Sequence, residues 1–185
     1  MFTLLQTYSY KNNVKYIHFL MLVQDRILQI IESKGLNKNS FSNSIGIQPQ
    51  TLHHIVGGRR TNPSFEVIER IISTYSDINA KWLITGEGSM SDMNIDSPEP
   101  FSGSDFGSIN KRFGQVIKEK QLTPTQMGEI LGMTAIYVRK LTGEGNSFGI
   151  EPIKKILISF PDLNARWLLT GEGEPFSEKQ ETVKL

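Results

Sequence analysis

Apolar residues recur at helical spacing along most of the chain. The first group comprises Val23, Ile27, Ile30 and Ile31. Side chains three and four residues apart lie on one face of an α-helix, whereas strict alternation is typical of a strand. Four more short groups follow before residue 90, so the pattern predicts five short helices over 22–90.

The same pattern of apolar and polar residues occurs a second time in the chain. The segments NAKWLITGEG at 79–88 and NARWLLTGEG at 164–173 are identical at eight of ten positions. Upstream residues align at an offset of 86, which becomes 85 after one residue is lost near Pro63. We interpret the chain as two copies of one unit, at 22–90 and 108–176.

Start and stop signals divide each copy into helices. Asn37 and Thr123 are expected to cap the second helix, and Pro124 and Gln126 add a first-turn proline and a capping box in the second copy. The other predicted start residues are Gln48, Thr134, Asn79 and Asn164, and the predicted stops are Gly35, Gln121, Gly57, Gly143, Gly86 and Gly171. Trp82 and Trp167 are expected to close the core of each copy.

Three segments lie outside the two copies. Residues 1–21 are interpreted as a poorly ordered N-terminal extension from an over-long start, because Met21 directly precedes the first helical pattern; a helix packed on the first copy is the alternative. Residues 91–107 are rich in Ser, Pro and Gly and contain four acidic residues but no Lys or Arg, so they predict a flexible acidic linker. Residues 177–185 form a polar tail expected to fray.

Composition narrows the class of protein only slightly. The chain has 38% apolar and 21% charged residues and a net charge of +1, which is ordinary for a soluble protein and does not indicate a nucleic-acid partner. It has no cysteine, which excludes disulfides and thiolate metal sites and fits a cytoplasmic location. No apolar run approaches the roughly 18 residues of a membrane-spanning helix, so no membrane partner is expected.

No motif for catalysis or ligand binding stands out. The TGEG segments follow a short predicted helix rather than a strand and lack the Lys of a phosphate-binding loop. His53 and His54 have no third ligand at workable spacing. We therefore expect no enzyme activity, no cofactor, no metal and no small-molecule ligand.

The second and third predicted helices of each copy, joined by a tight turn at Gly46 or Gly132, have the layout of a helix-turn-helix. The segments KGLNKNSFSNSIGIQPQTLHHIVGGRR and KQLTPTQMGEILGMTAIYVRKLTGE resemble the phage repressor/Cro family, also called the XRE family. The endings WLITG and WLLTG are similar to that family's fifth helix. The resemblance implies an all-α fold of two tandem five-helix lambda-repressor-like helix-turn-helix domains, and sequence-specific binding to double-stranded DNA.

In the first copy, the third predicted helix would present its N-terminal residues to base edges in the major groove. These are Gln48, Pro49, Gln50 and Thr51, with His54 one turn further on. The resemblance implies base reading at Pro49, Gln50 and His54. Gln50 can also make a bidentate contact with adenine. The alternative is a solvated polar face.

Phosphate contacts are expected around this helix. The family often has Gln at the first residue of the second helix, whereas this chain has Lys38 in the first copy and Pro124 in the second; Lys38 can still meet a phosphate, but Pro124 offers no donor. The loop after the third helix is suited to phosphates, which position a protein without specifying sequence. Its candidate residues are Arg59, Arg60, Thr61 and Asn62.

The second copy differs at the same positions. Its equivalent residues are Thr134, Ala135, Ile136, Tyr137, Arg139 and Lys140. Ile136 replaces Gln50 and cannot make a bidentate amide contact. Thr134, Tyr137, Arg139 and Lys140 remain candidate DNA contacts, but an Ile and a Tyr beside basic residues suit a protein contact equally well.

The sequence therefore predicts a DNA-binding transcriptional regulator, a repressor of the phage or mobile-element type, with the first copy as the main base reader. A homodimer is possible, and the linker would let the second copy add affinity through a high effective concentration. The alternative is a protein-interaction module such as an antitoxin or an anti-repressor.

Overall fold

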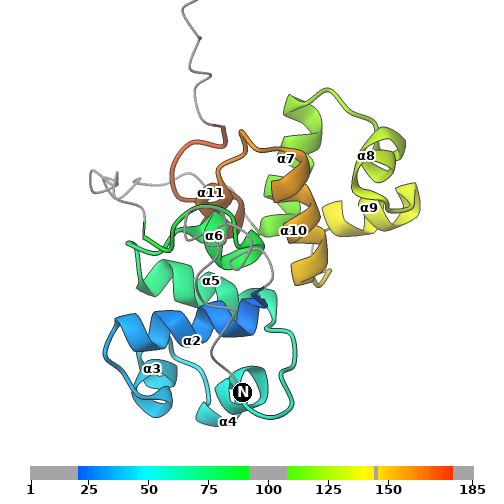
Figure 1. The fold of residues 1–185 in the computed structure, drawn as a ribbon. Helices are drawn as coiled ribbons and strands as arrows, with labels where there is room; N and C mark the ends of the chain where they lie inside the picture. The colour runs from blue at the N-terminus through cyan, green and yellow to red at the C-terminus, as the bar shows by residue number, and fades with distance from the viewer. Residues whose placement is uncertain (1–20, 92–107, 144–145, 177–185) are drawn as a thin grey trace, which may run out of the picture.

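The chain folds as an array of short helices. The computed structural model describes residues 21–91, 108–143 and 146–176 (Figure 1). In these ranges regular structure is helical, apart from two isolated β-bridges, which confirms the all-α prediction. Most of the predicted extension and linker, and the whole tail, lie outside the described residues. No helix in the described part is long and apolar enough to cross a membrane.

The helices form two matching series. The first copy contains α2 (Val23–Ser33), α3 (Lys38–Ser44), α4 (Pro49–Val56), α5 (Phe65–Thr74) and α6 (Ala80–Thr85). The second contains α7 (Ile109–Glu119), α8 (Pro124–Leu131), α9 (Ala135–Thr142), α10 (Ile150–Ser159) and α11 (Ala165–Thr170).

Most predicted N-caps act as caps. The side chain of Asn37 accepts a hydrogen bond from Ser40 N at 2.9 Å, and Thr134 accepts one from Tyr137 N at 3.2 Å. Thr123 and Gln126 form the reciprocal capping box. Gln48 is the exception: it occupies the N-cap position of α4, but its side chain makes no capping bond, and Pro49 follows at the first helical position. These bonds satisfy amides that the first turn of a helix leaves unpaired.

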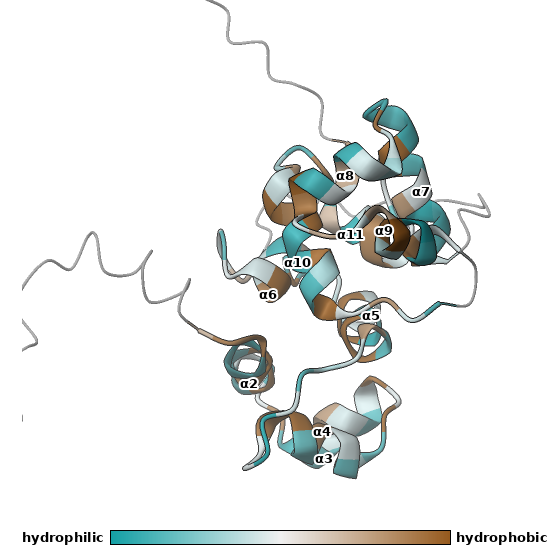
Figure 2. Ribbon diagram, turned by 90° about the vertical axis from the view of Figure 1, so that its right-hand side faces the viewer, coloured by the Kyte–Doolittle hydropathy of each residue, from teal (hydrophilic) through white to brown (hydrophobic). Residues whose placement is uncertain are grey.

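The apolar faces of the helices meet in the interior of each copy. Figure 2 shows that the helices carry both hydrophilic and hydrophobic stretches, as amphipathic helices do. Trp82 and Trp167 are 1% and 0% exposed and are among the largest fully buried side chains. The prediction that they belong to the core is therefore confirmed.

A buried arginine ties the first helix of each copy to its last. Arg26 donates from Nε to Leu83 O at 2.8 Å and from Nη2 to Ile84 O at 2.9 Å. Arg112 makes the same pair of bonds to Leu168 O and Leu169 O, at 2.9 and 2.8 Å. Burial lowers the pKa of Arg26 to about 10, although Asp25 opposes this shift. Because the carbonyls at a helix end have no partner within the helix, the guanidinium satisfies them directly.

Each copy ends by folding back on the start of its last helix. The glycines that stop α6 and α11, Gly86 and Gly171, have φ of +82° and +86°, the left-handed conformation that glycine adopts without strain. The chain then returns, and Ser91 forms a β-bridge with Ile78. The carbonyl of Met21 accepts a bond from Arg26. Met21 and Ser91, which flank the predicted unit at 22–90, both pair with its interior.

The two copies pack against each other in a reciprocal way. Helix α6 contacts α10, α11 contacts α5, and α6 and α11 also touch. In both ribbon views α6 and α11 lie near the middle of the molecule, with α3 and α4 on one side and α8 and α9 on the other (Figures 1 and 2). The sequence had predicted only a flexible tether between the copies.

The turn after the first helix differs between the copies. Gly35 and Gln121 occupy equivalent positions with φ of +62° and +53°. A non-glycine residue in this region is strained by roughly 1 kcal/mol because its Cβ approaches the backbone. Gln121 therefore carries a strain that Gly35 avoids.

We predict that Gln121→Gly raises the free energy of unfolding by about 0.5–1 kcal/mol, because the relief of strain exceeds the added entropy of the unfolded chain. Gly35→Ala should lower it by a similar amount, although a Cβ at Gly35 would meet nothing within 4 Å. Urea denaturation measures both changes. Gly114→Ala is the control, since Gly114 lies within α7 with open space around a Cβ, so alanine should stabilise there. A destabilised Gln121→Gly variant would contradict the strain argument.

Candidate nucleic-acid interface

The turn between α3 and α4 sets the direction of α4. Gly46 has φ of +67°, and Ile47 N bonds to Ser42 O at 2.9 Å across the turn. A Cβ at Gly46 would lie 3.0 Å from Arg70 Nη1, the mobile end of a long side chain that can move aside, so it is the positive φ that favours glycine here. Helices α3 and α4 pack together, and the buried residues Leu52 and Ile55 fix α4 on α2.

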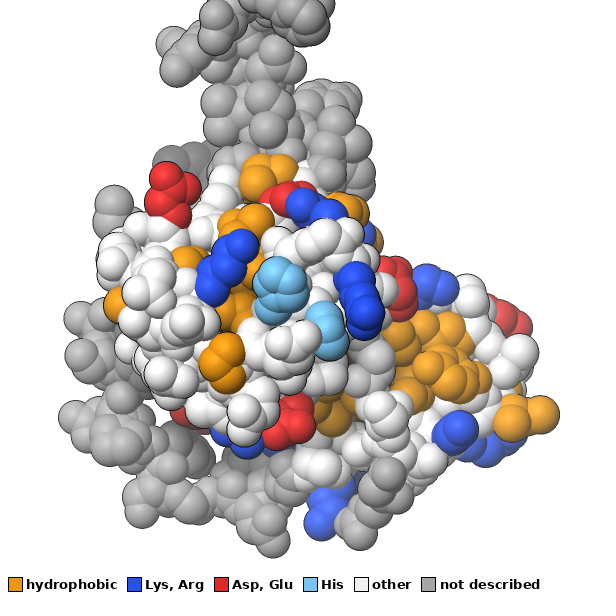
Figure 3. Space-filling model, turned by 90° about the horizontal axis from the view of Figure 1, so that it is seen from below, with side chains coloured by type: hydrophobic (Ala, Val, Ile, Leu, Met, Phe, Trp, Pro, Cys, Tyr) orange, Lys and Arg blue, Asp and Glu red, His pale blue; other side chains and the backbone are white. Residues whose placement is uncertain are grey.

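The opposite face of α4 is open to solvent and polar. Gln48, Pro49, Gln50 and Thr51 are exposed and His54 is half-buried. The side chains of Gln50 and His54 meet, with 3.2 Å between the two Nε2 atoms. The structure thus brings all five predicted reading residues onto one surface. Figure 3 shows the two histidines of α4 on the lower face of the molecule with Lys and Arg side chains around them.

The loop after α4 is held in place by α2. Gln24 Nε2 donates to Arg60 O and Thr61 O, both at 3.1 Å, and also approaches Asn62 Oδ1 at 3.3 Å. Gln24 is 3% exposed, so one buried amide fixes three consecutive residues of an exposed loop. The equivalent Asn110 donates to Leu141 O at 2.6 Å and Asn146 O at 3.2 Å.

The two arginines of this loop are not equivalent. Arg60 forms an ion pair with Asp25 on α2 and has φ of +46°. Arg59 is exposed, and the described residues give it no ion pair. Lys38 is exposed at the first position of α3. Arg59 and Lys38 are therefore the freer cations on this surface, whereas Arg60 must leave Asp25 to meet a phosphate.

The second copy presents a different face. Ile136 is 77% exposed and Tyr137 39% exposed, while Arg139 and Lys140 are also exposed. The hydroxyl of Thr134 accepts the capping bond from Tyr137 N, so its first role is to start α9. Among the described residues Ile136 is the most exposed large apolar side chain. The surface of α9 is thus both apolar and basic, whereas that of α4 is polar.

Sequence reasoning missed the residues that support these faces. Gln24 and Asp25 hold the loop after α4, and Arg26 holds α6. A signal was present, because Arg26 and Arg112 are identical in the two aligned copies while the residues beside them vary. A polar residue retained on the buried face of both first helices indicates an internal hydrogen-bonding role.

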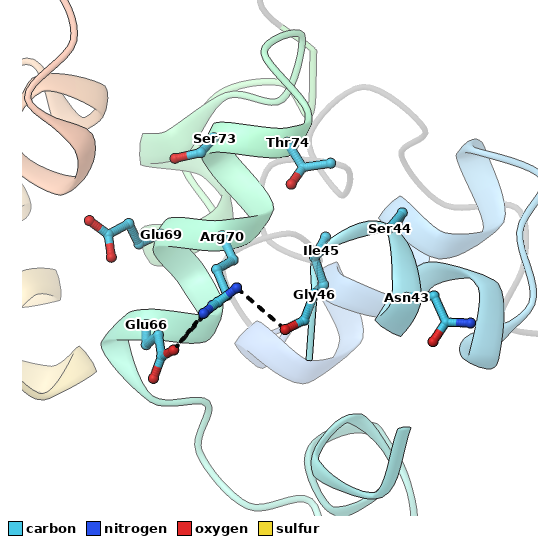
Figure 4. A pocket seen from close by; sticks show the side chains of 9 residues that line it. All are labelled: Asn43, Ser44, Ile45, Gly46, Glu66, Glu69, Arg70, Ser73 and Thr74. Atoms are coloured by element: carbon cyan, nitrogen blue, oxygen red, sulfur yellow. Dashed lines mark hydrogen bonds and ion pairs between the residues drawn. The ribbon is translucent and has the colours of Figure 1, made fainter. Parts of the chain in front are cut away.

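A groove between α3 and α5 offers little to a ligand. Its volume is about 530 Å³. Arg70 crosses it and is already engaged, by Glu66 at 2.9 Å and by Gly46 O at 3.3 Å (Figure 4). Among the described residues no three His, Asp or Glu side chains gather as metal ligands would.

Comparison of the chain with family models, with curated proteins and with solved structures finds no match. The geometry of the two exposed helices bears most directly on function. That geometry consists of a rigid turn, a polar face on α4 and an anchored loop beside it.

We predict that Gln24→Ala lowers the free energy of unfolding by about 1–2 kcal/mol, because it removes the hydrogen bonds that the buried amide of Gln24 makes to the loop carbonyls. Hydrogen exchange at residues 58–62 should become faster. Gln29→Ala on the same helix is the control, since within the described part of the chain the amide of Gln29 bonds only to the sulfur of Met21, at 3.6 Å. Equal effects of the two substitutions on loop exchange would contradict the anchoring role.

Proposed function

We propose that the chain is a sequence-specific DNA-binding transcriptional regulator, a repressor of the phage or mobile-element type built from two tandem lambda-repressor-like helix-turn-helix domains. The observation that carries this proposal is the exposed polar face of α4, presented across a tight turn from α3. A helix held in this way can enter the major groove with its N-terminal residues toward the base edges.

Gln50 is the proposed base reader. An amide accepts from adenine N6 and donates to adenine N7 when its oxygen and one N–H are free. The contact with His54 Nε2 at 3.2 Å restrains the Gln50 side chain through its other N–H. This restraint supports direct reading, because less side-chain freedom is lost when DNA binds.

Cations beside α4 are proposed to set affinity. Arg59 and Lys38 are exposed and can each neutralise a phosphate. Thr61 and Asn62 lie in the loop anchored by Gln24 and offer neutral hydrogen bonds to the backbone of DNA. Arg60 joins this set when it leaves Asp25 and binds a phosphate. Its contribution to DNA affinity is reduced, because the ion pair with Asp25 is lost.

The second copy is proposed to add affinity through α9. Arg139 and Lys140 meet phosphates, and Tyr137 adds a further contact. Ile136 can touch only an apolar group such as the thymine methyl. Reading by α9 is therefore less selective than reading by α4.

A protein-interaction role for the second copy is the other candidate. The observation that favours it is the 77% exposure of Ile136 beside a half-exposed Tyr137, because aromatic and aliphatic anchors are typical of protein contacts. In this alternative the chain would act as an antitoxin or an anti-repressor.

The test is in vitro selection of DNA sites by the full chain, followed by binding measurements on the selected duplex. Gln50→Ala should weaken binding by about 1–3 kcal/mol and relax selectivity at one base position. The control is Asn43→Ala, an exposed amide near the far end of α3, which should bind as the wild type does.

Salt dependence tests the phosphate contacts separately. The logarithm of affinity should fall linearly with the logarithm of salt concentration, by about 0.9 per phosphate neutralised. Arg59→Ala should weaken binding to all sequences alike and reduce that slope by about one. If neither Gln50→Ala nor the double substitution Arg59→Ala/Arg60→Ala changes binding to the selected site, the proposed surface is wrong.

A further inference from the structure

The contact between the two copies is built around one arginine. Arg166, on α11, donates from Nη1 to Ile72 O at 2.9 Å and from Nη2 to Ser76 O and Ile78 O at 2.7 and 3.0 Å. These carbonyls belong to the end of α5 and to the segment that leads into α6. The Arg166 side chain is only 12% exposed. Three charge-assisted bonds from one planar, largely buried group fix orientation as well as distance.

The matching residue of the first copy does not repeat this contact. Lys81 occupies the position of Arg166, and both side chains form an ion pair within their own copy, Lys81 with Glu87 at 3.2 Å and Arg166 with Glu172 at 3.3 Å. Of the two, among the described residues, Arg166 alone also bonds to carbonyls of the other copy. A lysine ammonium is a single point charge and cannot reproduce the rigid fork of a guanidinium. The packing of helices between the copies is therefore reciprocal, but the polar contact is one-sided. In this contact, which we call the Arg166 lock, a side chain of the second copy bonds to carbonyls of the first.

Two opposite charges mark the same asymmetry. Glu69 on α5 and Arg112 on α7 both line a groove of about 410 Å³ between the copies and attract each other. Burial raises the pKa of Glu69, and the attraction of Arg112 opposes that rise. The residue equivalent to Glu69 in the second copy is Lys154. Two second copies associating in the same manner would place Lys154 opposite Arg112, and like charges at such a contact are unfavourable.

The contact also determines where the two exposed helices lie. Helices α6 and α11 form the contact, and α4 and α9 extend from it on opposite sides (Figures 1 and 2). Each exposed helix packs on the first helix of its copy, which the buried arginine ties to α6 or α11. A fixed contact at the centre thus fixes the separation of the two reading surfaces.

We infer that a single chain binds DNA as one rigid unit that carries two reading surfaces. Arg166 locks the copies together, and α4 and α9 engage two unlike half-sites at a single separation, without a second chain and without a palindrome. This inference rests on the proposed function and adds to it the architecture of the DNA site. Arg166 is a positioning residue here and need not touch DNA.

The rigidity can be measured without DNA. The chain has no cysteine, so Asn39→Cys and Thr125→Cys, at equivalent exposed positions of α3 and α8, introduce the only two sites for spin labels. Pulsed electron paramagnetic resonance should give one narrow distance distribution. Adding Arg166→Ala should broaden it, whereas adding the matched control Lys81→Ala should not. Circular dichroism establishes that both variants keep their helices.

The DNA half of the inference is tested on the selected duplex. Inserting about 5 base pairs, half a helical turn, between the half-sites should weaken wild-type binding by about 100-fold, because only one of the two reading surfaces can then contact its half-site. Arg166→Ala should lose most of this dependence on spacing, and Lys81→Ala should keep it. Sedimentation should find one chain per duplex.

The outcomes separate the two proposals. A broad distance distribution in the wild type, two chains per duplex, or binding that tolerates the insertion would overturn the inference while leaving DNA binding in place. A narrow distance distribution with no DNA sequence selected would show that the copies are rigidly packed but that the proposed function is wrong. The inference about the DNA site would then fall with it.

Discussion

The last helix of each copy is the element on which the rest of the structure depends. Helices α6 and α11 have six residues each, too few to be stable alone. Trp82 or Trp167 buries one side, and Arg26 or Arg112 satisfies carbonyls at the C-terminal end. The other side of the same helices forms the contact between the copies. Core closure and the mutual placement of the copies are therefore properties of one short segment, which explains why it is the most similar part of the two copies.

The two copies share this frame and differ on the surface that it presents. Equivalent helices carry Gln50 and His54 in one copy and Ile136 and Lys140 in the other. A symmetric pair of such surfaces would suit a palindrome, whereas this pair suits two different half-sites or one DNA site and one partner. The one-sided lock by Arg166 is consistent with the same asymmetry, because it distinguishes the copies at their contact.

The sequence predicted what is local and missed what is distant. Helix positions, the caps at Asn37, Thr123 and Thr134, and the glycine stops follow from neighbouring residues, and the structure confirms them. The five residues proposed to read bases, at the start of α4 and one turn further on, lie on one surface, as helical periodicity predicts. The bonds of Arg26, Gln24 and Arg166 join residues 36 to 94 positions apart, so no local pattern contains them. The ion pair between Arg60 and Asp25 was missed for the same reason, because the two residues are distant in the sequence and come together only in the folded chain.

The central claim is that α4 and its anchored loop form the surface that meets DNA. The most direct measurement is hydrogen exchange of the full chain with and without a random-sequence duplex at low ionic strength, where phosphate contacts alone hold the complex. The account predicts protection concentrated at residues 48–62, with a weaker effect at 134–140. Protection confined to other helices, or no protection at any duplex concentration, would contradict it.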